Sequence, residues 1–74
     1  MTKWNSILLS LGDAVRVCRC RKGLTQKEFA KKARLHRTYV ADFERGKRNP
    51  TLKSFVQLAR ALDVSPAKLL KGVR

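Results

Sequence analysis

The chain has 74 residues, enough for one small domain with a modest core, and we expect residues 1–74 to fold as a single domain. Its 43% hydrophobic residues argue against a disordered chain, although 18 Lys and Arg against five Asp and Glu give a formal net charge of +13. Such a charge predicts a polyanionic partner, and the alternative is a basic surface that serves solubility alone.

The first predicted helix starts at Ser6 or Ser10 and ends at Arg21. Basic residues in its last turn suit the negative end of the helix dipole, and Gly23 follows as a stop signal. Apolar residues recur along this segment at helical spacing and predict one buried stripe: Leu11, Val15 and Cys18.

A second helix is predicted to start at Thr25. The Thr25 hydroxyl can cap the amide of Glu28, while the Glu28 carboxylate can reach back to the amide of Thr25. A third helix is predicted from His36 to Glu44, and Gly46 suits the left-handed residue that ends it. The side chains of this pair expected to face the core are Phe29, Ala30, Ala33, Val40 and Phe43.

Two further helices complete the pattern. Pro50 and Thr51 open the fourth, and Ser65 as cap with Pro66 at the first helical position starts a short fifth. The apolar residues expected to face inward from these helices are Leu52, Phe55, Val56, Ala59, Leu62, Leu69 and Leu70. We therefore predict an all-α fold, a compact bundle of five helices whose short connections force steep packing angles.

The remaining residues predict neither catalysis nor a metal site. Cys18 and Cys20 point to nearly opposite sides of a helix and cannot form a disulfide, and only His36 could join them as a ligand. The chain has no nucleophile–base set and no phosphate-cradling glycine loop, so we expect no enzyme activity, cofactor or small-molecule ligand. With no convincing signal peptide and no apolar run near about 18 residues, we expect a cytoplasmic protein without a membrane partner.

The stretch from Thr25 to Arg48 carries the side chains that point to a function. A planar cation, a hydroxyl, an aromatic ring and a carboxylate share the exposed face of the third helix, and such groups read base edges: Arg37, Thr38, Tyr39 and Asp42. In a strongly basic chain, a two-helix unit of this kind is typical of a protein that holds one helix in a DNA groove.

Four motifs occur in order: G-L-T-Q at 23–26, F-A at 29–30, E-R-G-K-R-N-P at 44–50 and A-L-D-V-S-P at 61–66. With them, residues 11–70 resemble the helix-turn-helix domain of the Cro/phage-repressor type, the XRE family. The run 36–40 followed by 44–46 is most similar to the short controller proteins of restriction–modification systems. The resemblance implies a lambda repressor-like fold with its core at 11–70 and an N-terminal extension at 1–9. It also implies a sequence-specific transcriptional regulator that binds double-stranded DNA.

The resemblance assigns the base-reading roles to the third helix, which becomes the recognition helix. Arg37 would donate two hydrogen bonds to guanine, the alternative being a solvated arginine. Thr38 would contact a thymine methyl group or a phosphate, and Tyr39 would lie along the backbone or beside a sugar. Asp42 would accept from a cytosine amino group, or else be a surface partner of Arg45 or Arg37.

Other residues are expected to contact phosphates, which fixes register without reading sequence. Gln26 resembles the family glutamine that bonds a phosphate near the start of the second helix. The loop Lys47, Arg48 and Asn49 would straddle the backbone, unless it is only a solvated charged loop.

Arg34 and His36 depart from the family pattern, and we expect both near phosphates. Arg34 stands where Gly or Asn usually adopts a positive φ, so either the turn is reshaped or the arginine is tolerated for a phosphate contact. His36 replaces the usual Ser, Thr or Asp cap. It would make DNA binding depend on pH, unless it is a surface histidine of no consequence.

Family members often place a partly buried ion pair between the first and third helices, here Arg19 with Glu44. The family also implies a homodimer that reads two half-sites. The candidate residues for its interface are Leu69, Leu70, Val73, Trp4, Ile7 and Leu8, although Trp4 can equally pack against its own domain. Two other functions compete with the regulator: an antitoxin or other protein-binding module of the same fold, and a non-specific nucleic-acid binder.

Overall fold

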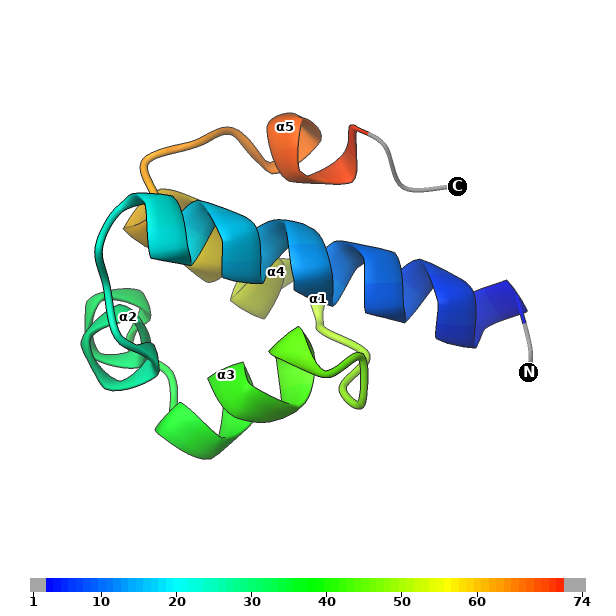
Figure 1. Cartoon of the computed structure of the whole chain (residues 1–74), viewed down its shortest axis with the longest axis horizontal. Helices are drawn as coiled ribbons and strands as arrows, with labels where there is room; N and C mark the ends of the chain where they lie inside the picture. Colours follow the sequence, from blue (N-terminus) through cyan, green and yellow to red (C-terminus); the bar gives the residue numbers. More distant parts are fainter. Residues whose placement is uncertain (1–2, 72–74) are drawn as a thin grey trace.

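The computed structural model describes residues 3–71, and these form five α-helices without a β-strand, as predicted. In order they are α1 (Lys3–Arg21), α2 (Gln26–Ala33), α3 (Arg37–Glu44), α4 (Leu52–Ala61) and α5 (Pro66–Leu70). Helix α1 runs along the length of the molecule, with α2 at one end, α3 on one side, α5 on the other and α4 behind (Figure 1). None of these helices is long and apolar enough to cross a bilayer.

Helix α1 begins earlier than predicted. The expected start was Ser6 or Ser10, but the helix already includes Lys3, so it is longer by less than one turn relative to Ser6 and by about two turns relative to Ser10. No acidic residue stands in its first turn, so the sequence offered no charge signal for that start.

The capping box predicted at the start of α2 is confirmed. Thr25 Oγ1 accepts a hydrogen bond from the Glu28 amide at 3.0 Å, and Glu28 Oε1 accepts one from the Thr25 amide at 2.9 Å. These bonds occupy two amide donors that the first turn of a helix leaves without backbone partners. The hydroxyls of Thr51 and Ser65 likewise cap α4 and α5.

The core lies where the five helices converge. Its largest fully buried side chains come from α1, α2, α3, α4 and the residue that follows α4, and they are Val15, Phe29, Val40, Phe43, Leu58 and Leu62. Leu58 was not predicted, whereas Leu52, predicted to face inward, is 78% exposed. Leu52 is the first residue of α4 and is not among the side chains packed in the core. Leu70 was also predicted to be buried and is 48% exposed.

Helices α1 and α3 approach each other closely at Gly12. A Cβ atom added at Gly12 would stand 2.9 Å from the carbonyl oxygen of Glu44 and closer still to that of Phe43. Gly12 is buried, so the missing side chain lets the end of α3 pack directly against the α1 backbone. This contact positions α3, and its outer face stays exposed.

Candidate nucleic-acid interface

The outer face of α3 begins with two side chains that are free to bind. Arg37 and Thr38 are both exposed, and within residues 3–71 neither side chain has a hydrogen bond or ion pair. They occupy the first two positions of the helix, immediately after its N-cap His36. A guanidinium and a hydroxyl with unused donors at this end of a helix are suited to base edges or phosphates.

The turn before α3 keeps the geometry that usually requires glycine. Arg34 is left-handed, with φ of 59° and ψ of 41°, and its amide donates to the carbonyls of Ala30 and Lys31. The turn is therefore not reshaped around the arginine, which costs roughly 1 kcal/mol relative to glycine. His36 caps α3 without a side-chain hydrogen bond. Both side chains are exposed beside the start of α3.

Tyr39 has partners within the fold that the sequence did not indicate. Its hydroxyl lies 2.6 Å from the hydroxyl of Ser54, which is buried at the start of α4, and its ring packs against the core. The guanidinium of Arg48 lies 4.6 Å from the ring centroid, within the range of a cation–π contact. Tyr39 thus connects α3 to α4 and to the loop between them.

Asp42 pairs with arginines of the same region. Its Oδ1 lies 2.6 Å from Nη2 of Arg45, and its Oδ2 lies 4.0 Å from Nη2 of Arg48. This is the arrangement of a surface partner of Arg45, one of the two expected alternatives. The backbone carbonyl of Asp42 also accepts from the amide of Lys47 at 2.9 Å.

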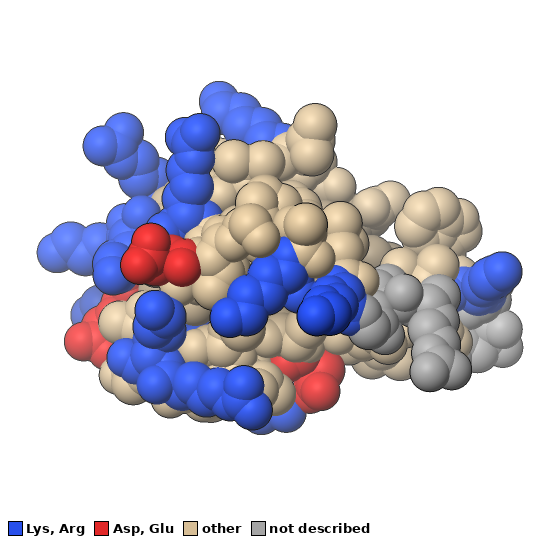
Figure 2. Space-filling view, turned by 90° about the horizontal axis from the view of Figure 1, so that it is seen from above, with Lys and Arg blue, Asp and Glu red and all other residues tan. Residues whose placement is uncertain are grey.

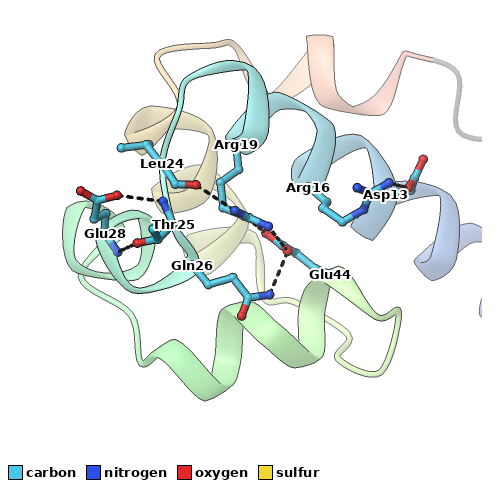
Figure 3. Close-up of polar contacts among 8 residues, drawn as sticks. All are labelled: Asp13, Arg16, Arg19, Leu24, Thr25, Gln26, Glu28 and Glu44. Atoms are coloured by element: carbon cyan, nitrogen blue, oxygen red, sulfur yellow. Dashed lines mark hydrogen bonds and ion pairs between the residues drawn. The ribbon is translucent and has the colours of Figure 1, made fainter.

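The expected pair of Arg19 and Glu44 is present and belongs to a larger network (Figure 3). Arg19 Nε donates to Glu44 Oε2 at 2.7 Å and Nη2 to Oε1 at 3.1 Å, while Nη1 donates to the carbonyl of Leu24 at 2.8 Å. The Glu44 side chain is 2% exposed and that of Arg19 is 14% exposed. The hydrogen bond to Glu44 raises the pKa of Arg19 above its usual value.

Gln26 also belongs to this network, which the sequence did not indicate. Its Nε2 donates to Oε1 of Glu44 at 3.0 Å, so α2, α3 and α1 meet at one carboxylate (Figure 3). A phosphate contact made by Gln26 would therefore be connected to α3 through the side chain of Glu44. No local pattern reveals such a contact, because the two residues lie 18 positions apart.

The loop after α3 presents the three polar residues expected there. Lys47, Arg48 and Asn49 are all exposed, and Gly46 before them has φ of 74°, as predicted. The amide of Gly46 donates to the carbonyl of Phe43 at 3.0 Å, so the loop leaves the helix in a defined direction. The guanidinium of Arg48 lies beside α3, near the carboxylate of Asp42 and the ring of Tyr39.

Basic side chains are not confined to the recognition helix. Figure 2 views the face that α5 covers, away from α3, and Lys and Arg side chains gather there at the end of the molecule where α2 lies. Basic side chains therefore occupy a second face of the molecule as well as the loop after α3. Such charge attracts a polyanion without selecting a sequence.

Two helices joined by a left-handed turn, an exposed α3 with unpaired Arg37 and Thr38, and a basic loop define a DNA-binding protein of the helix-turn-helix class. Comparison with known proteins agrees: the helix-turn-helix family model matches residues 15–69, and the chain belongs to this family. Within residues 3–71 there is no cluster of three or more potential metal ligands.

The relatives include controller proteins of restriction–modification systems. The control protein C.BamHI of Bacillus amyloliquefaciens is 42% identical over 67 residues, which cover 89% of this chain and 83% of that protein. The controller protein C.AhdI of Aeromonas hydrophila has a solved structure that is similar with a TM-score of 0.83, at 42% identity over 84% of this chain and 94% of that one. The C.Esp1396I controller tetramer, solved with its natural 35 base-pair operator, aligns with a TM-score of 0.82 at 33% identity, covering 90% and 88% of the two chains.

Proposed function

We propose that this protein is a sequence-specific transcriptional regulator that inserts α3 into the major groove of double-stranded DNA. The observation that carries the proposal is the contrast within α3. Its last residue, Glu44, is held by a buried network, while its first two residues, Arg37 and Thr38, are exposed and unpaired. A rigidly held helix with free donors at its leading end is what base recognition requires. Controller proteins of the same family, one of them solved on its operator, support it.

Arg37 is proposed as the main base-reading residue. Its fork of donors matches the two acceptors of guanine in the major groove, a pairing worth roughly 1–3 kcal/mol of discrimination. Thr38, beside it, would contact a thymine methyl group or a phosphate. Tyr39 and Asp42 would act mainly by positioning other groups, because both have partners within the fold.

Phosphate contacts are proposed on both sides of α3. The exposed loop residues Lys47, Arg48 and Asn49 would bind one backbone, and Arg34 and His36 lie at the other end of the helix. The start of α2, next to Gln26, adds amides with partial positive charge. These contacts would give affinity that falls steeply with salt.

A homodimer is proposed to form at the end of the molecule opposite α2. Trp4 is 65% exposed there and does not pack into the core. It borders an open apolar groove of about 310 Å³ together with Ile7, Leu8, Leu11, Leu52, Phe55 and Leu70. Leu69, also expected at the interface, is only 2% exposed and belongs to the core, and Val73 lies outside the described residues.

Proposals on domain organisation, catalysis and cellular location follow from this function. We propose that residues 1–74 act as a single domain without catalytic activity or cofactor, and that the protein works in the cytoplasm, where its DNA would be. The C.Esp1396I controller forms a tetramer on its operator, and a regulator built from dimers accords with that assembly.

The decisive experiment selects bound sequences from random duplex DNA at two salt concentrations, with wild-type protein and with Arg37→Ala. We expect a palindromic consensus for the wild type and its loss in the variant. Binding without any consensus would point to a non-specific binder. No DNA binding, together with a co-purifying protein seated on the Trp4 groove, would point to a protein-binding module.

A further inference from the structure

A carboxylate lies among the cations that would meet DNA. The chain has only five Asp and Glu, and one of them, Asp42, sits on the partly exposed side of the recognition helix. Its side chain is 27% exposed, one turn beyond Thr38 on the same face of α3. A negative charge at this point repels phosphate, so its presence calls for a physical reason.

Both oxygens of this carboxylate face an arginine. Arg45 Nη2 is 2.6 Å from Oδ1, and Arg48 Nη2 is 4.0 Å from Oδ2. The ring of Tyr39 supports Arg48 from another side, with the guanidinium 4.6 Å from its centroid, and the hydroxyl bond to Ser54 holds the ring itself. Arg48 therefore has a defined place in the free protein.

Both arginine side chains can nevertheless change partners. The side chains of Arg45 and Arg48 are 62% and 45% exposed, so each can exchange Asp42 for another anion without opening the core. Exposed ion pairs are weak and salt-screened, and a DNA phosphate offers the same kind of oxygen acceptor. A phosphate oxygen that approaches either guanidinium would therefore compete with the carboxylate of Asp42.

We propose that Asp42 is a specificity-determining residue. Its carboxylate takes the place of a DNA phosphate beside the arginines and so weakens complexes in which the protein contacts only the DNA backbone. On random DNA, where α3 is not seated in the groove, Asp42 competes with phosphates for both arginines and repels the strand. On the operator, α3 enters the groove, so Asp42 faces base edges while the arginines turn to the flanking backbone. The penalty therefore falls mainly on non-specific complexes. This inference rests on the proposed function.

The test compares two neutralised acids. Asp42→Asn removes the restraint, and Asp13→Asn is the matched control. Asp13 pairs with Arg16 at the same 2.6 Å and the same i,i+3 spacing, but on α1, and its loss changes the net charge equally. Affinity is measured by fluorescence anisotropy on a random-sequence duplex and on the selected consensus, each over a series of salt concentrations.

For Asp42→Asn we expect non-specific affinity to rise roughly three- to tenfold above that of the control, as one or two weak pairs are lost. The salt dependence should steepen by about one phosphate contact, or about 0.9 in log–log slope. Affinity for the consensus should rise less, so the ratio of specific to non-specific affinity falls. Adding Arg48→Gln to Asp42→Asn should return the slope toward the wild-type value, and Asp42→Ser provides a second neutral variant of smaller volume.

Equal behaviour of Asp42→Asn and Asp13→Asn on random DNA would overturn the inference. So would a loss of consensus affinity with unchanged non-specific affinity, because that result assigns Asp42 to reading cytosine. The random-DNA measurement does not need an operator. Failure to select a consensus would therefore contradict the proposed function, while the affinities for random DNA would still decide whether Asp42 weakens non-specific binding.

Discussion

Arg19 and Glu44 join α1 to the last residue of α3 through two parallel hydrogen bonds of 2.7 and 3.1 Å. The pair lies at the opposite end of α3 from Arg37, so it holds the helix away from its exposed first turn. Glu44 is nearly inaccessible to water; Arg19 balances its charge, and the side-chain amide of Gln26 donates a further hydrogen bond to it.

Removing the carboxylate of Glu44 should cost more stability than removing the exposed guanidinium of Arg37. Glu44→Ala leaves Arg19 partly buried without its partner, and we expect a loss of about 3–5 kcal/mol. Arg37→Ala touches an exposed side chain and should change stability by no more than about 0.5 kcal/mol. Urea unfolding of both variants measures the difference. Equal unfolding free energies would contradict the structural role of Glu44.

Gly12→Ala should displace α3 from α1. The added methyl group would meet the Glu44 carbonyl oxygen at 2.9 Å, and backbone cannot move aside as a flexible side chain can. We expect a stability loss of about 1–3 kcal/mol, with weaker DNA binding because the recognition helix shifts. Ser10→Ala, at an exposed position of the same helix, is the control and should leave both properties near wild type. A melting temperature of Gly12→Ala equal to that of the wild type would argue against tight packing between α1 and α3.

Arg34→Gly should stabilise the fold and weaken DNA binding. Glycine adopts the observed φ of 59° without the steric cost of a side chain, which is worth roughly 1 kcal/mol. Arg34→Ala keeps the strain and removes the charge, so it separates the two effects. We expect Arg34→Gly to melt at a higher temperature than both the wild type and Arg34→Ala. A lower melting temperature for Arg34→Gly would show that the arginine side chain stabilises the turn.

The capping box should make stability depend on acid through Glu28. The hydrogen bond that the Glu28 carboxylate accepts from the Thr25 amide lowers the pKa of Glu28 below its ordinary value near 4.5. The folded state therefore favours the charged carboxylate, and its contribution is complete above pH 4.5 and lost as pH falls through the lowered pKa. Glu28 is exposed, so the effect is small. Melting temperatures from neutral pH into the acid range should fall more for the wild type than for Glu28→Gln, and parallel curves would refute this.

The features that sequence predicted well are local. The capping box at Thr25 and Glu28, the left-handed Gly46 and the caps at Thr51 and Ser65 depend on residues three or four positions apart. Helical spacing likewise predicted the buried faces of α2 and α3. The same reasoning was wrong for Leu52, because periodicity describes a helix face but not where the facing elements end.

The sequence by itself determined the helical order, the basic character and the family, because these depend on short-range patterns and on composition. Tertiary structure alone decided what the side chains of the recognition region do. Gln26 meets Glu44, Tyr39 meets Ser54, and Gly12 meets the end of α3. These partners lie 15 or more residues apart, so no local pattern encodes them, and they form only when packing of the core brings their helices together.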